Sequence, residues 1–195
     1  MKLFKNIKKW LEDQEHLFYL FLFILIVPNI VLCFTEPLSF IAKVCNVLLP
    51  FGCYYLLMTL SRNCGKMLWI LFLFLFFGAF QIVLLYLFGQ SIIAVDMFLN
   101  LATTNVTEAS ELLNNLWPAI ILVCVIYIPT IVIAAIGCKK RVHLTPVFRK
   151  KMACTGLIIG LVSYGLTFTA TNRNTGSYKL QYDVFPVNIY YNLRF

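Results

Sequence analysis

Residues 17–34 read LFYLFLFILIVPNIVLCF, an apolar stretch without a single charged side chain. A helix rises ~1.5 Å per residue, so about 20 residues cross a hydrocarbon core of ~30 Å. The core of a cleaved signal peptide is shorter, about 7–15 residues, and Cys33-Phe34-Thr35 is not a small-x-small cleavage site. The stretch therefore predicts a retained transmembrane helix.

Four more runs have the same length and character. Backbone groups in lipid must be hydrogen-bonded within their own segment, so each run should be helical. The fold class expected is an all-α membrane protein with five transmembrane helices and an interfacial helical segment between the third and fourth. The expected spans are Leu17–Phe34, Ser39–Leu60, Met67–Phe88, Pro118–Cys138 and Met152–Ala170.

Composition supports lipid as the solvent. Hydrophobic residues make up 61% of the chain and charged residues 12%, against about 45–50% and about 25% in soluble domains. The net charge of +8 comes from clusters between the apolar runs, which is typical of topology signals and gives no reason to expect a nucleic-acid partner.

The basic residues also predict an orientation. Twelve of the 16 Lys and Arg residues fall on one side of the five spans, and positive residues favour the cytoplasm. We therefore expect a multi-pass protein of the bacterial inner membrane with a cytoplasmic N-terminus and a periplasmic C-terminus. The twelve are Lys2, Lys5, Lys8, Lys9, Arg62, Lys66, Lys139, Lys140, Arg141, Arg149, Lys150 and Lys151.

The segment Gly89–Trp117 lies on the expected outer side. Its polar residues Asp96, Asn100, Thr104 and Glu108 recur every four residues. On one helix, steps of four would place them in a slanting polar stripe. A carboxylate can pair with an ammonium, and an amide and a hydroxyl can donate to a phosphate, so the stripe suits a zwitterionic lipid headgroup.

A second interpretation explains the same residues. They can form the solvated face of an amphipathic helix, with Thr103, Thr104 or Asn105 capping a second helix that begins near Val106. The spacing alone leaves both interpretations open.

The pattern Asp96-Met97-x-x-Asn100-x-x-x-Thr104-x-x-x-Glu108-Ala109 resembles the outer-face segment of bacterial phosphoethanolamine transferases that modify lipid A, including the mobile colistin-resistance enzymes. That family has five N-terminal transmembrane helices, with this segment between the third and fourth, and the resemblance covers most of the chain. It implies that Asn100, Thr104 and Glu108 bind the headgroup of a phosphatidylethanolamine donor, with Asp96 in a less certain role. The acceptor would be lipid A or a related glycolipid, and the product would weaken binding of cationic peptides such as polymyxin.

The chain also departs from the family. Those enzymes use a threonine nucleophile and zinc held by Asp, Glu and His of a periplasmic catalytic domain, and a zinc site needs about three protein ligands. This chain has two histidines, both on the expected cytoplasmic side. We therefore expect a transmembrane domain over 1–170 that holds no catalytic residue and no metal ligand. Residues 171–195 would be a periplasmic lead-in to a catalytic domain missing from the chain, which by itself should be inactive.

Two alternatives remain. One is a non-catalytic membrane protein, such as a transporter subunit or an assembly factor. Transporters usually carry ionisable groups near the middle of the bilayer, and these spans carry almost none. The other is the membrane domain of a phosphoglycerol transferase, whose headgroup lacks the ammonium that Glu108 would bind.

Overall fold

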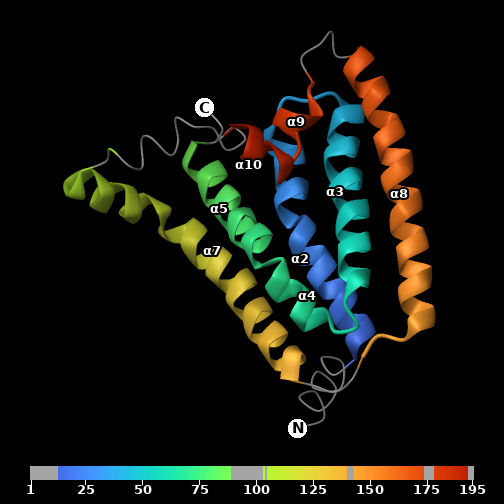
Figure 1. The fold of residues 1–195 in the computed structure, drawn as a ribbon. Coiled ribbons are helices and arrows are strands. Elements are labelled where there is room, and N and C mark those ends of the chain that lie inside the picture. Colours follow the sequence, from blue (N-terminus) through green and yellow to red (C-terminus); the bar gives the residue numbers. More distant parts are fainter. Residues whose placement is uncertain (1–12, 89–102, 104, 140–142, 174–177, 193–195) are drawn as a thin grey trace.

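A computed structural model of the chain describes residues 13–88, 103, 105–139, 143–173 and 178–192 (Figure 1). These residues form helices and connecting turns, with no strand among them. The helices are α2 (Gln14–Thr35), α3 (Phe40–Leu60), α4 (Cys64–Ile70), α5 (Phe72–Phe88), α7 (Val106–Lys139), α8 (Pro146–Arg173), α9 (Leu180–Asp183) and α10 (Val187–Asn192).

The predicted spans correspond to long apolar helices. Four helices are long and apolar enough to cross a membrane: Gln14–Thr35, Phe40–Leu60, Asn114–Lys139 and Pro146–Ala170. The expected third span is instead two helices, α4 and α5, which meet at Leu71 with a bend of 66°. Counted as one broken span, this pair brings the candidate spans to five, so the structure supports the class of an all-α membrane protein.

The helices alternate in direction between two faces of the bundle. At the N-terminal face, α2 begins, α3 turns into α4, α7 ends and α8 begins (Figure 1). At the opposite face, here called the C-terminal face, the chain turns from α2 into α3 and α5 ends. Helices α9 and α10 also lie at this face. The described basic residues Arg62, Lys66, Lys139 and Arg149 therefore lie on elements that meet at one face, as the charge pattern requires.

Helix α7 differs from its prediction. The expected boundary between an interfacial segment and the fourth span lay at Trp117-Pro118, but α7 runs unbroken from Val106 to Lys139 with Pro118 and Pro129 inside it. Its 34 residues give a length of about 51 Å, well beyond the ~30 Å core. Residues 106–117 are thus the first turns of α7, and the structure does not confirm an interfacial helix separate from the fourth span. Figure 1 shows this start of α7 lying apart from the other helices.

The main core lies among α2, α3, α4, α5, α7 and the first turns of α8. Phe18 is fully buried at its centre and packs edge-on against the rings of Tyr55 and Phe148, with centroids 5.5 and 5.4 Å apart. Such edge-to-face pairs add about 0.5–1.5 kcal/mol beyond burial. The aromatic residues therefore fix how α2, α3 and α8 meet near the N-terminal face.

Glycines bring α8 close to α3, the helix against which α8 mainly packs. A Cβ added at Gly52 would lie 2.7 Å from the backbone nitrogen of Gly160, and one at Gly156 would lie 2.7 Å from Cβ of Tyr55. Small residues at helix crossings are the usual means of close packing in membranes, where lipid gives helices little hydrophobic reason to associate.

Side chains close the N-terminal face. Asn63 caps α4 by accepting from the Lys66 amide, and its Nδ2 donates to the Gly137 carbonyl at 2.9 Å. Arg149 donates from Nε to the Thr59 carbonyl at 2.8 Å and from Nη2 to that of Leu60 at 3.0 Å. The two Arg149 bonds satisfy carbonyls at the end of α3 that have no partner within that helix, so they tie α8 to α3.

Candidate lipid-binding site

The predicted stripe falls largely outside the described residues. Asp96, Asn100 and Thr104 lie outside them, and Glu108 lies in the first turn of α7. Helix α7 begins at Val106, where the capping interpretation expected a second helix to begin. Asn105 is not helical, so the last step of the stripe, from Thr104 to Glu108, crosses the start of a helix.

The start of α7 presents polar side chains. Those of Asn105, Thr107, Ser110 and Glu111 are exposed, and the Ser110 hydroxyl donates to the Thr107 carbonyl at 2.7 Å. These turns precede Asn114, the first residue of the part of α7 that qualifies as a span. Glu108 is therefore carried on a helical extension at the C-terminal face of the bundle.

The C-terminal segment, residues 178–192, packs into this same face. Although its sequence is more polar than the spans, Tyr178, Val184, Phe185 and Asn188 are each at most 1% exposed. Phe185 joins a cluster with Leu32 of α2 and residues of α5, and a second cluster joins Tyr178 and Val184 to α3 and α8. The segment thus binds four of the long helices together.

Two buried asparagines hold the segment in place. Asn29 of α2 donates from Nδ2 to the carbonyls of Asn46, at 3.1 Å, and Phe185, at 2.8 Å. Asn46 of α3 donates to the Asp183 carbonyl at 2.9 Å and accepts from the Tyr178 hydroxyl at 2.8 Å. An amide buried without partners would cost several kcal/mol in an apolar environment, so these bonds explain why both asparagines are tolerated inside apolar helices.

Neither asparagine was predicted as a functional residue from the sequence. The available signal was their position, since each is a polar residue inside an apolar run, where such residues are costly and usually have a role. Their partners in the C-terminal segment lie more than 130 residues away in sequence, and the spacing of the chain gave no indication of that pairing.

Burial also affects the ionisable groups of the segment. Burial raises the pKa of the Asp183 carboxyl, partly opposed by the Lys179 amide, which donates to Oδ2 at 2.6 Å, and by the Lys179 charge. Burial likewise raises the pKa of the Tyr178 phenol. Tyr178 therefore stays protonated and can donate to Asn46 at any physiological pH.

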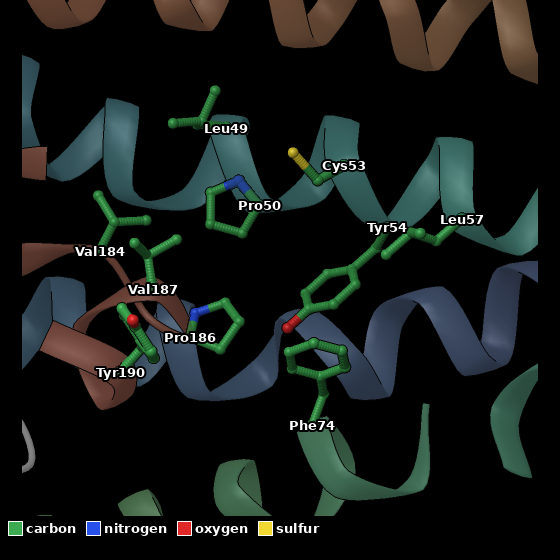
Figure 2. Close-up of a pocket in the computed structure, with 10 residues that line it drawn as sticks. All are labelled: Leu49, Pro50, Cys53, Tyr54, Leu57, Phe74, Val184, Pro186, Val187 and Tyr190. Atoms are coloured by element: carbon green, nitrogen blue, oxygen red, sulfur yellow. The ribbon is translucent and has the colours of Figure 1, made fainter. Parts of the chain in front are cut away.

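An apolar groove of about 370 Å³ lies between α3, α5 and the C-terminal segment (Figure 2). Tyr54 of α3 and Phe74 of α5 lie next to each other on its wall and pack edge to face, with ring centroids 6.5 Å apart. Pro186, Val187 and Tyr190 close one end. Its walls are almost wholly apolar and are formed by Leu49, Pro50, Cys53, Tyr54, Leu57, Phe74, Val184, Pro186, Val187 and Tyr190.

A second hollow, of about 570 Å³, lies on the other side of the C-terminal segment, against α8. Its lining mixes polar groups, among them Lys179, Gln181 and Thr167, with the aromatic rings of Tyr164 and Phe168. Val187 borders both the groove and this hollow. The C-terminal face therefore offers an apolar groove on one side of Val187 and a hollow of mixed polar and aromatic lining on the other.

The described residues hold no group of three or more His, Cys, Asp or Glu side chains that could bind a metal ion. His16 lies in the first turn of α2 and His143 just before α8, so both belong to the N-terminal face, away from the groove and Glu108. The described residues of this chain do not fit the zinc ion that the resemblance implies.

The chemistry available at the C-terminal face is thus apolar burial, hydrogen bonding and charge pairing. Comparison of the chain with protein-family models, with curated proteins and with solved structures gave no match.

Proposed function

We propose that this chain is the membrane domain of a phosphoethanolamine transferase, which binds phosphatidylethanolamine and positions its headgroup for transfer to lipid A or a related glycolipid. The observation that carries the proposal is the motif from Asp96 to Ala109, with Glu108 placed on the helical extension that begins α7. The apolar groove and the hollow of mixed polar and aromatic lining, both bordered by the C-terminal segment, give a diacyl lipid surfaces of suitable chemistry.

In this proposal the chain acts by positioning. Lipid tails remain in the bilayer while the Glu108 carboxylate pairs with the headgroup ammonium, and Asn100 and Thr104 donate to the phosphate. Holding a reactant in the geometry of attack lowers the entropic part of the barrier. The nucleophile and zinc would be supplied by a periplasmic catalytic domain, with the C-terminal face of the bundle toward the periplasm and the N-terminus in the cytoplasm.

The proposal is tested with the full open reading frame that encodes the chain. Expressed in a Gram-negative host without such transferases, it should yield lipid A carrying phosphoethanolamine, detected by mass spectrometry. Glu108→Gln removes the carboxylate charge while keeping its shape. A hydrogen bond to a charged group contributes about 1.5–3 kcal/mol, so transfer should fall roughly 10- to 100-fold.

Glu111→Gln is the matched control, because Glu111 lies on the same turns of α7 with an exposed side chain and belongs outside the stripe. It should keep the wild-type rate. Unmodified lipid A from the full open reading frame would overturn the proposal, and so would equal rates for the two glutamine variants. Lipid A that gains phosphoglycerol would instead favour a phosphoglycerol transferase.

A further inference from the structure

We propose that the groove between α3, α5 and the C-terminal segment holds one acyl chain of a membrane glycerophospholipid. If the proposed function is right, this lipid is the phosphatidylethanolamine donor. The identification of the lipid rests on the proposed function, but the occupancy of the groove by an acyl chain does not.

The shape and depth of the groove match a hydrocarbon chain. It follows α3 from Leu49 to Leu57, eight residues or ~12 Å along the axis, within a helix that qualifies as a span. The rings of Tyr54 and Phe74 pack edge to face, with centroids 6.5 Å apart, and together form part of its wall. Methylene groups suit an apolar slot at this depth, because water there would find almost no hydrogen-bonding partner on the walls.

The groove is continuous with the surface that the bundle presents to lipid. Cys53 on its wall is exposed, and Tyr190 at its closed end is 63% exposed. Because Cys53 lies on a candidate membrane span, an acyl chain from the bilayer can enter the groove sideways at this wall, whereas a water-soluble ligand has no comparable route. Tyrosines are also enriched at membrane interfaces, so Tyr190 marks the end of the groove at which a headgroup would lie.

Lys43 places a positive charge on α3 between the start of that helix and the groove. Lys43 precedes Pro50 by seven residues, nearly two turns, so both lie on one side of α3 about 10 Å apart along the axis. A lipid whose tail occupies the groove brings its phosphate toward the level of Lys43 at the start of α3. The apolar lining of the groove suits the acyl chain of a glycerophospholipid, and the positive charge of Lys43 suits its phosphate.

The groove is tested by photocrosslinking in membranes. The chain is placed in vesicles of phosphatidylethanolamine and phosphatidylglycerol that contain a trace of either lipid with a diazirine midway along one acyl chain. Peptide mapping should then find adducts concentrated on the groove residues Cys53, Tyr54 and Leu57. Adducts spread evenly over the exposed apolar residues of α7 and α8 would mean surface lipid only, and would overturn the proposal.

Two exposed cysteines supply a matched pair of variants. Cys53→Trp fills the groove, whereas Cys154→Trp adds the same ring to an exposed position of α8 outside it. Native mass spectrometry after detergent washing should find several-fold less retained phospholipid on the first variant and an unchanged amount on the second. Equal retention by both variants overturns the proposal. If Cys53→Trp does not fold, Leu57→Trp fills the other end of the groove.

The two lipids separate this proposal from the proposed function. Crosslinking of both lipids in the groove with equal yield supports the acyl-chain site and counts against a donor-specific role for it. Preference for phosphatidylethanolamine supports both. An empty groove together with modified lipid A in the transfer assay overturns the acyl-chain site alone.

Discussion

The Tyr178 hydroxyl donates a hydrogen bond of 2.8 Å to Oδ1 of Asn46, a residue 132 positions earlier in the sequence. Both residues are buried, at 0% and 2% exposure. The bond joins the C-terminal segment to α3. Asn46 makes a second bond to the same segment, because its Nδ2 donates to the Asp183 carbonyl.

Tyr178→Phe should therefore loosen this segment. The substitution leaves Oδ1 of Asn46 buried without that donor, which costs about 1–3 kcal/mol. Thermal unfolding in detergent should show a Tm lower by several degrees, and protease should cut residues 178–192 sooner. Tyr86→Phe removes the same hydroxyl from a side chain of α5 that is 54% exposed and should leave both measurements unchanged. Matching behaviour of the two variants would show that the Asn46 bond contributes little.

Gly52→Ala should weaken the contact of α3 with α8. The new methyl would lie 2.7 Å from one backbone atom of Gly160 and 2.9 Å from another, so the helices must separate. Overpacking of this kind costs about 1–3 kcal/mol, measured as a lower Tm.

Gly165→Ala on α8 is the control for that variant, since a Cβ there meets nothing within 4 Å. Alanine is favoured over glycine in helices by up to about 1 kcal/mol, so its Tm should stay level or rise. A lower Tm for the Gly165 variant than for the Gly52 variant would contradict the close-packing argument.

Asp183→Asn should remove a pH dependence of stability. Because burial raises the pKa of Asp183, the folded protein holds this proton more tightly than the unfolded chain does. Its contribution therefore favours folding at low pH and is lost as pH rises from the ordinary aspartate value of about 3.9 through the raised pKa. The Tm of the variant minus that of the wild type should increase over this window and then level off. A constant difference across the titration would exclude the effect.

Arg149→Lys should lower stability although it keeps the charge. The guanidinium bonds two carbonyls at the end of α3 at once, and lysine does not reproduce that fork. We expect a loss of about 1 kcal/mol in the free energy of unfolding, measured with denaturant. Lys150→Arg, the reverse exchange at the exposed neighbouring position, should have no effect.

Hydropathy was enough to predict most of the long apolar helices, because helices in lipid must be long, apolar and internally hydrogen-bonded. It did not predict the 66° bend at Leu71, which has no proline or glycine to mark it. Conversely, Pro118 suggested a boundary that α7 does not have. The local sequence shows how apolar a segment is, but the position of a bend depends on the other helices against which the segment packs.

At the candidate site, too, one feature could be predicted from local sequence and others could not. The start of a helix near Val106 could be predicted from its capping residues, and the structure has it there. The groove could not be predicted, because its walls come from three separate parts of the chain that meet only in the folded bundle. The burial of Tyr178 and Phe185 was equally hidden, since their surroundings read as a polar tail.

The hydrogen bonds of Asn29 and Asn46 have a consequence for biosynthesis. Ribosomes release α2 and α3 long before residues 178–192, so both amides leave the ribosome while their partners in the C-terminal segment are still unmade. They must meanwhile bond to water, lipid or the insertion machinery. The bundle accordingly completes its assembly only after residues 178–192 have been synthesised.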